Sequence, residues 1–283
     1  MPPRKAPTAR QRRLGTELRK MRERAGYNIA EGAERVGTDR TTISNTESAR
    51  FGVSAERVRA WANAYECPDE AYVDALADMA AERGQGWWEE YRNGLVNIAL
   101  DLAELEHHAA GIRSVQIMHV PGVLQTEDYM RAVYEGAVPA ISPTRLRRRL
   151  SHRLKRRDVL DRDNPPTCTF LIHEAALRMV YGGVKVARNQ LDYLLSESHR
   201  DNVTIRAIPF AAGGFPNAGS SSQYLYGVVP QLDTVQTDTP SGSAFLDAET
   251  PLANWRAVLD RTEECSLDPD KSREFIRTIA KQL

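Results

Sequence analysis

The stretch that most restricts how this chain can fold is residues 37–48, GTDRTTISNTES. A glycine turn is followed by Thr38 or Asp39 as a helix N-cap, so the stretch predicts a short helix from about residue 40. Ile43 is its one plainly apolar side chain and anchors the inner face. The other face carries hydroxyl, amide and guanidinium groups, which contribute little to a core and favour contact with a polar partner.

Two helices are expected before this polar helix. Leu14, Leu18 and Met21 recur at three- and four-residue spacing, which predicts an amphipathic helix. Gly26 ends that helix, and Asn28 can cap a second, short helix with the sequence IAEGAERV. The side chains expected to point inward from the second helix are Ile29, Ala33 and Val36.

Two more helices are expected after the polar helix. Ser54 can cap a fourth, and a fifth runs from about Asp69 to Arg83. A short helix, a glycine turn and a short polar helix with supporting helices is the helix-turn-helix arrangement. There the polar helix offers hydrogen-bonding groups to base edges in the major groove, and its N-terminus offers N–H groups to phosphate. A five-helix interaction module that touches no nucleic acid is the alternative. The buried stripe of the fourth helix is expected to be Val58, Trp61, Ala62 and Tyr65.

Residues 14 to 65 resemble the helix-turn-helix domain of phage-repressor-type (Xre) regulators. The matching pieces are LRKMRERAG, AERVG, TTIS followed by Glu47, and ERVRAWANAY. The resemblance implies that the partner is double-stranded DNA. It implies base reading by Arg40, Thr41, Thr42 and Asn45, with nearby phosphate or base contacts from Ser44 and Arg50. The expected DNA-binding set is completed by residues at two helix starts, Asn28, Thr38 and Asp39.

The match departs from the family at three positions. Ile29 stands where the family usually has a phosphate-binding glutamine, Gly32 replaces a core leucine, and Thr46 replaces an apolar residue. We therefore expect the second helix to be loosely packed and one contact with the DNA backbone to be absent.

Charge is balanced over the chain, with 38 Lys plus Arg and 38 Asp plus Glu, so net charge alone indicates no partner. Its distribution is uneven, because basic residues predominate between Arg4 and Arg24, as is typical of an end that faces nucleic acid. A solvated basic tail would also explain this. The 3 cysteines are widely spaced, which fits a reducing cytoplasm. No signal peptide or bilayer-length apolar run is visible, so we expect a cytoplasmic protein with no membrane partner.

Residues 145–157, RLRRRLSHRLKRR, predict one helix with an apolar seam of leucines and arginines around it. Three interpretations stay open for these arginines: a solvated face, a contact with a partner or second copy, and a second contact with the DNA backbone. The last would cause a steep salt dependence. In the helix expected over 97–111, Glu104 and His108 have the spacing of a metal pair, but no third ligand is evident. We expect no metal and no cofactor.

The chain from Thr167 onward alternates between strand and helix patterns and predicts an α+β domain. Before it, VPGVLQTEDYMRAVYEG predicts a turn and a helix capped at Thr126. The fold class we expect is α+β, with an all-α five-helix N-terminal domain and a larger mixed α/β C-terminal domain. Strands are expected at TCTFLIH, NVTIRAIPF, SSSQYLYGVV, DTVQT and SAFLDA, and helices at EAALRMV, VARNQLDYLLSES, PLANWRAVLDRTEECS and PDKSREFIRTIAKQL.

The sequence offers little for catalysis. It has no G-x-S-x-G nucleophile elbow, no P-loop and no dinucleotide-binding glycine motif. The His173-Glu174 pair lacks a second histidine one turn on, and the serines at 220–222 lie in a glycine-rich turn. The Ser/Lys dyad of self-cleaving repressors is not evident either. We therefore expect no enzymatic activity.

Several C-terminal motifs occur together in one order: GWW, VPGVLQTEDYMRAV, HEAALR with a glycine pair after it, and NVTIRAIPF. With them, nearly the full chain resembles the actinobacterial helix-turn-helix regulators of the WhiJ-like, antitoxin-like type. The resemblance implies a transcriptional regulator encoded beside a small partner protein that acts with or against it. It implies no catalytic residues.

These observations predict three parts: a DNA-binding domain at 10–83, a linker and connecting helix at 84–112, and an α+β regulatory domain at 113–283. The leading hypothesis is a sequence-specific regulator, a repressor, that binds DNA as a homodimer and a small protein through its C-terminal domain. One alternative is a small-molecule effector bound beside GGFPNAGSSSQYLY, residues 213–226. Another is an enzyme tethered to DNA.

Overall fold

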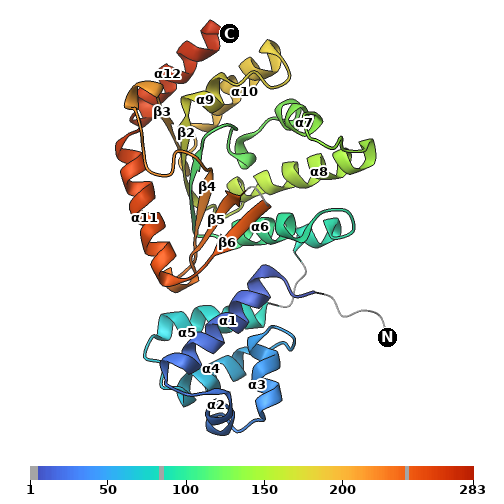
Figure 1. Cartoon of the computed structure of the whole chain (residues 1–283), viewed down its shortest axis with the longest axis vertical. Helices are drawn as coiled ribbons and strands as arrows, with labels where there is room; N and C mark the ends of the chain where they lie inside the picture. Colours follow the sequence, from blue (N-terminus) through green and yellow to red (C-terminus); the bar gives the residue numbers. More distant parts are fainter. Residues whose placement is uncertain (1–5, 83–85, 240–241) are drawn as a thin grey trace. The chain divides into compact units, whose positions relative to one another are not determined.

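The computed structural model describes residues 6–82, 86–239 and 242–283. The chain divides into two compact units, Met1–Glu89 and Glu90–Leu283. The first is all-α and the second is a mixed α/β unit, so the expected fold class is confirmed (Figure 1). The expected boundary between residues 83 and 84 lies outside the described residues. The expected boundary at 112/113 falls inside a strand, so the connecting helix and the C-terminal domain belong to one unit.

The described part of the first unit holds five α-helices, as predicted. Their shared core includes Leu18, Ile43, Val58 and Leu76, one from each helix but the second, and all four are fully buried. The apolar stripe expected on the fourth helix is buried as predicted. The helices are α1 (Ala9–Arg24), α2 (Ile29–Arg35), α3 (Arg40–Glu47), α4 (Ala55–Ala64) and α5 (Glu70–Ala81).

One expectation about α2 is wrong. Ile29 is 36% exposed rather than turned inward, and Val36 is only half-buried. The helix is seven residues long and buries its middle, Gly32 and Ala33, against its neighbours. Ile29 is its first residue, directly after the Asn28 N-cap, and is left at the surface.

The second unit is built on one sheet with the strand order β3-β2-β1-β4-β5-β6. The first three strands along the chain are parallel, and the last three continue the sheet antiparallel. Ile112 of β1 pairs with Cys168 of β2 on one side and with Leu225 of β4 on the other. The strands are β1 (Gly111–Gln116), β2 (Thr167–His173), β3 (Val203–Ile208), β4 (Ser222–Tyr226), β5 (Thr234–Thr239) and β6 (Gly242–Leu246).

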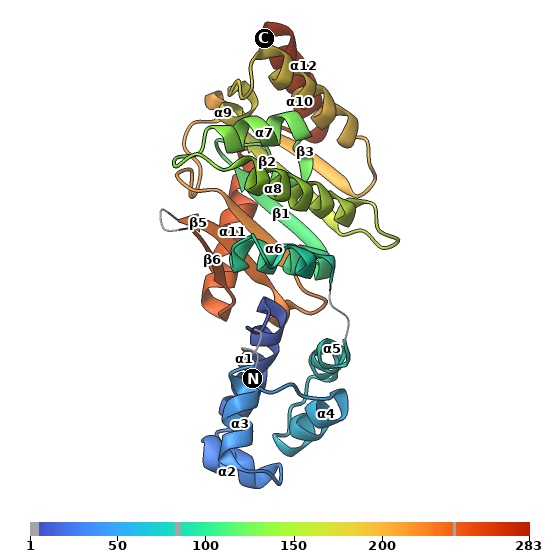
Figure 2. The same ribbon diagram turned by 90° about the vertical axis from the view of Figure 1, so that its right-hand side faces the viewer.

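Helices cover both faces of this sheet (Figures 1 and 2). One face packs against α7, α9, α10 and α12 through one apolar cluster, and the other face packs against α11 through another. The helices are α6 (Asn97–His108), α7 (Glu127–Glu135), α8 (Pro143–Arg156), α9 (Glu174–Arg178), α10 (Val184–Glu197), α11 (Glu249–Glu264) and α12 (Pro269–Gln282). Short 3-10 helices are η1 (Trp87–Tyr91), η2 (Gly122–Leu124), η3 (Arg157–Leu160), η4 (Phe210–Ala212) and η5 (Pro230–Leu232).

Strand β1 is central in the sheet but was not expected. Its sequence, GIRSVQ, lacks the apolar run of a buried strand because Arg113 and Ser114 interrupt it. The fold pairs the charge of Arg113, whereas the buried hydroxyl of Ser114 has no hydrogen-bond partner among the described residues. Ser114 is buried in the sheet, and the Arg113 guanidinium leaves it to pair with Asp260 at 2.7 Å and Glu263 at 2.8 Å on α11.

Candidate functional site

The first turn of α3 is fixed by a carboxylate cap. Asp39 accepts a hydrogen bond from the Thr42 N–H at 2.9 Å and a second from the Thr42 hydroxyl at 2.6 Å. These bonds, led by that of the hydroxyl, lower the pKa of Asp39. The N-cap is therefore Asp39 rather than Thr38, and the hydroxyl of Thr42 is used inside the helix.

The two faces of α3 differ in the way the sequence predicted. Ile43 and Thr46 are buried on the inner face. Among the described residues, no hydrogen bond or ion pair within the protein engages the side chains of the outer face. That face consists of Arg40, Thr41 and Ser44, which are exposed, and Asn45, which is half-exposed.

The remaining expected DNA-binding residues, Asn28, Thr38 and Arg50, lie outside α3 and have different surroundings. Asn28 is the N-cap of α2, where its side-chain Oδ1 accepts from the backbone N–H groups of Ala30 at 2.8 Å and Glu31 at 3.1 Å. Thr38 is half-buried in the turn before α3. Arg50 is exposed just after α3, where its N–H donates to the carbonyl of Asn45 at 2.7 Å. The side chain of Asn28 is thus occupied in capping α2. Arg40, Thr41, Ser44 and Asn45, in contrast, form one continuous surface on α3.

A buried ion pair holds α3 against α1. Arg22 donates from Nε and Nη2 to the two carboxylate oxygens of Glu47, at 2.6 and 2.8 Å, and from Nη1 to the carbonyl of Tyr27. A Cβ on Gly32 would lie 2.4 Å from Arg22 Cδ and 3.1 Å from the Tyr65 hydroxyl. The glycine makes room for the arginine, so the expectation of a loosely packed α2 is wrong.

The basic helix of the second unit, α8, buries one side and exposes another: Leu150, His152 and Arg156 are buried, whereas Arg145, Arg147 and Lys155 are exposed. Arg156 is buried and binds Glu106 through two hydrogen bonds, at 2.7 and 2.6 Å. Other guanidinium groups of this segment lie over tyrosine rings or donate to the backbone; these are Arg148, Arg149, Arg153 and Arg157. Among the described arginines of this helix, Arg145 and Arg147 remain exposed, on different sides.

A second group of polar and aromatic residues gathers where the parallel strands end. His119 follows β1, and Tyr181 lies between α9 and α10. Their rings stack at 5.1 Å, with His119 Nε2 and the Tyr181 hydroxyl 3.0 Å apart. Gly182 has φ +72, and a Cβ there would meet Ala132 of α7 at 3.0 Å, so the glycine lets this segment pack closely against α7. Neither His119 nor Tyr181 was singled out by the sequence.

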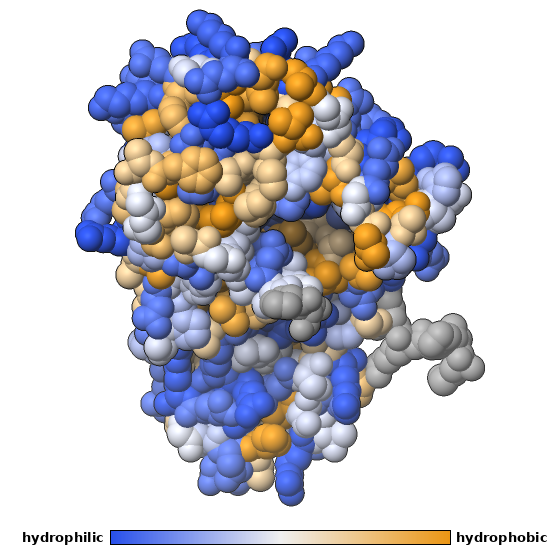
Figure 3. Space-filling model, turned by 45° about the horizontal axis from the view of Figure 1, so that its top comes forward, coloured by the Kyte–Doolittle hydropathy of each residue, from blue (hydrophilic) through white to orange (hydrophobic). Residues whose placement is uncertain are grey.

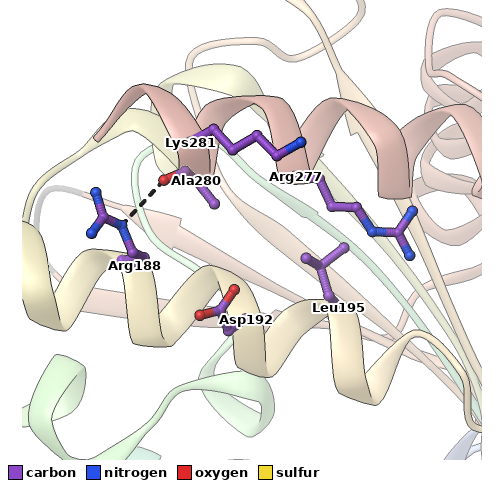
Figure 4. A pocket seen from close by; sticks show the side chains of 6 residues that line it. All are labelled: Arg188, Asp192, Leu195, Arg277, Ala280 and Lys281. Carbon is purple, nitrogen blue, oxygen red and sulfur yellow. Dashed lines mark hydrogen bonds between the residues drawn. The ribbon is translucent and has the colours of Figure 1, made fainter.

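The outer layer of the second unit has a shallow groove between α10 and α12 (Figure 4). Its volume is about 330 Å³, and it is lined by Arg188, Asp192, Leu195, Arg277, Ala280 and Lys281. Arg188 donates to the carbonyl of Ala280 at 3.3 Å, while the other two cations extend along the rim. The groove is open and mostly lined by long surface side chains, so it does not define a site.

The described residues lack two features that would indicate other classes of protein. None of the described helices combines the length and the apolar character of a membrane span. Within the same residues, no three His, Cys, Asp or Glu side chains gather as potential ligands of a metal ion.

The five-helix unit and its exposed polar α3 define a helix-turn-helix protein, a DNA-binding regulator. Residues 13–76 match a family model described as a helix-turn-helix domain. Residues 99–278, more than half of the chain, match the model described as a domain of unknown function, DUF5753, and the chain belongs to that family. No curated protein and no solved structure matches the chain.

Proposed function

We propose that this protein is a sequence-specific transcriptional regulator that reads base edges with the outer face of α3. The observation that carries the proposal is the continuous surface of Arg40, Thr41, Ser44 and Asn45, whose side chains make no hydrogen bond or ion pair with other described residues. Arginine and asparagine are the side chains that pair in bidentate fashion with guanine and adenine. The inner face of the same helix is held by Ile43 and by the ion pair between Arg22 and Glu47.

Fluorescence anisotropy with a duplex from the promoter of its own gene tests this proposal against a scrambled duplex. Arg40→Ala and Asn45→Ala should each weaken promoter binding by about 1–3 kcal/mol and change binding to the scrambled duplex much less. Arg59→Ala, on α4, removes the same charge as Arg40→Ala and is the matched control. If both α3 variants bind the two duplexes as the parent does, α3 does not read the sequence.

The finer proposal concerns what the second unit receives. We propose a repressor that acts in the cytoplasm and binds DNA as a homodimer. The resemblance to WhiJ-like regulators supports a second unit that binds a small protein encoded nearby. A homodimer fits two half-sites one helical turn of DNA apart. Pull-down with the product of the neighbouring gene, followed by a promoter shift with and without that product, tests this. If the pull-down does not capture the product of the neighbouring gene, the proposed protein partner is wrong, whereas the DNA-binding proposal is unaffected.

A small-molecule effector is the second candidate signal, and the aromatic and polar cluster around His119 and Tyr181 favours it. Part of the expected flank, residues 213–226, lies at the same edge of the sheet, since Phe215 packs on His173 at 5.5 Å. We regard the second unit as a sensor and not as an enzyme. Ser220, in the turn considered for a nucleophile, has its hydroxyl beside Thr237 and main-chain carbonyls, not beside a base.

A further inference from the structure

The carboxyl edge of the parallel strands combines a cation, an imidazole and several aromatic rings. Tyr181 connects them, because its ring stacks on His119 and meets Tyr129 edge-on at 5.2 Å. Arg153 is linked to the same place through Gln125, whose side chain accepts from Arg153 Nη1 at 2.9 Å and donates to the carbonyl of Val120, the residue after His119, at 2.7 Å. Burial, and then the charge of Arg153, lower the pKa of His119. In α/β sheets, ligands bind outside the carboxyl ends of the strands.

Arg153 is the unusual member of this cluster. Its Nη1 donates to Gln125 Oε1 at 2.9 Å, and its guanidinium lies over the Tyr134 ring at 5.0 Å. Among the described residues, no carboxylate lies within ion-pair distance of it. Arg156, one turn later, shows the contrast, because its guanidinium is fully paired with Glu106.

The surroundings of Arg153 leave its guanidinium partly buried and only partly hydrogen-bonded. The side chain keeps some contact with solvent, yet burial lowers its pKa. A guanidinium has five N–H donors, and only one hydrogen bond from Arg153 is made within the described protein. Such a partly desolvated cation with unused donors favours an anionic acceptor, since hydrogen bonds between charged groups are the strong ones.

Exposed apolar side chains surround the same edge. Met118 adjoins His119, Met179 and Val180 precede Tyr181, and Phe210 packs on His173 at 5.0 Å. All four are more than a third exposed, and Phe210 is 56% exposed. Figure 3, in which the top of Figure 1 is turned forward, shows hydrophobic residues beside a hollow in the surface. A concave site with an apolar lining and a few placed polar groups is typical of small-molecule binding.

We propose that this recess binds a small acid: an apolar, preferably planar body that packs among the rim and tyrosine rings, with one carboxylate that pairs with Arg153. His119 and the Tyr181 hydroxyl lie beside the anionic group and can donate or accept a further hydrogen bond. The inference rests on the second unit being the sensor of the regulator, and it names the chemical class of the signal.

The test uses the full-length chain and three defined probes, 1-naphthoate, phenylacetate and cyclohexanecarboxylate, each compared with its primary amide by calorimetry. We expect at least one acid to bind about ten- to a hundredfold more tightly than its amide, the range of a charge-assisted hydrogen bond. Arg153→Met should abolish that preference. Arg147→Met, an exposed arginine of the same helix, should leave it unchanged.

A second variant guards against a folding defect in Arg153→Met. Phe210→Ser changes an exposed rim residue and should weaken the acid and its amide alike, several-fold, without changing the preference. The proposal is overturned if no acid is preferred over its amide, or if the preference survives in Arg153→Met. Promoter binding is measured on the same samples. If the parent protein binds the promoter but prefers no acid over its amide, the acid site is wrong and the regulator stands. If the parent prefers an acid but does not bind the promoter, the proposed regulator is wrong.

Discussion

Arg22 of α1 and Glu47 of α3 form a buried bidentate ion pair, with 2.6 Å between Nε and Oε1 and 2.8 Å between Nη2 and Oε2. Removing one partner of such a pair leaves an uncompensated buried charge, which costs about 3–5 kcal/mol. We therefore expect Arg22→Met to lower the free energy of unfolding of the first unit by about that amount. The double variant Arg22→Met/Glu47→Leu should recover most of the loss, because an apolar pair can replace a buried ion pair.

Urea unfolding, followed by tryptophan fluorescence, measures these changes in the free energy of unfolding of the first unit. Trp61, Trp87 and Trp88 belong to the first unit, and Trp255 is the one tryptophan of the second. A Trp255→Phe background therefore makes the signal report on the first unit alone. An Arg22→Met variant as stable as its parent would contradict the importance of the pair.

Gly15 of α1 faces the last carbonyls of α3. A Cβ there would lie 2.5 Å from the carbonyl oxygen of Glu47 and 2.9 Å from that of Thr46, and these backbone atoms cannot rotate away. Helix propensity alone predicts that Gly15→Ala stabilises by about 0.5–1 kcal/mol. Packing predicts a loss of about 1–3 kcal/mol. The two arguments predict opposite signs for the change in the free energy of unfolding, so the same fluorescence experiment decides between them.

Gly52→Ala is the control for Gly15→Ala. It lies in the same unit, and a Cβ there would meet no atom within 4 Å. Its unfolding midpoint should stay close to that of the parent. A Gly15→Ala protein that is more stable than its parent would show that α1 and α3 are less tightly packed than their geometry indicates.

Thr46 is the buried polar residue of α3. It is 2% exposed, and its hydroxyl oxygen has no hydrogen-bond partner among the described residues. Valine has nearly the same shape without the hydroxyl, so Thr46→Val should stabilise the first unit by about 1 kcal/mol in the same assay. Promoter binding should not change, because the residue faces inward. Thr41→Val, on the outer face, should do the reverse: little effect on stability and weaker promoter binding.

The first unit could be predicted closely because its signals are local. Caps at Asn28 and Ser54, the turn at Gly26 and the inward Ile43 depend on neighbours within a few residues. The error about Gly32 had a different origin. The arginine that fills its space belongs to another helix, and such compensation between distant residues cannot be read from either residue alone.

The second unit could be predicted less well for the same reason. Strand β1 is polar at Arg113 and Ser114 because α11 and the neighbouring strands supply their surroundings, and neither is near in sequence. The sequence could not decide among the three interpretations of the α8 arginines, because the partners of several of them, such as Glu106 and Tyr134, lie on other elements. His119 and Tyr181, 62 residues apart, meet only because the sheet aligns the loops at one edge. These groupings require the tertiary fold.

Cys168 offers a reporter for the stability of the second unit. It is fully buried in β2, and burial raises the pKa of its thiol to about 12, so the reactive thiolate is scarce in the folded chain. Cys67 and Cys265 are half-exposed. We expect a brief pulse of methyl methanethiosulfonate to label Cys168 only in unfolded chains, as read by peptide mass spectrometry across a urea series. Labelling of Cys168 without urea at the rate of the other two would contradict its burial.

His152 on α8 should make the second unit less stable in mild acid. Burial, and then the charges of Arg156 and Arg153, lower its pKa to about 3, whereas an unfolded histidine has a pKa of about 6.5. Between these values the unfolded chain binds the additional proton, so the free energy of unfolding falls as pH decreases. From pH 7 to pH 5 the contribution of this one group is about 2 kcal/mol. His119 and His173, whose pKa values are also lowered, act in the same direction, so a difference between variants is needed.

His152→Phe supplies that difference. The ring lies edge-on to Tyr91 at 5.1 Å, a contact that phenylalanine can keep, and phenylalanine takes up no proton. Cys168 labelling at pH 7 and pH 5 should show a smaller loss of stability in His152→Phe than in the parent, by about 2 kcal/mol, whatever the variant does to stability at pH 7. An equal loss in both proteins would mean that His152 is protonated as readily in the folded chain as in the unfolded one, and so is not held neutral by its surroundings.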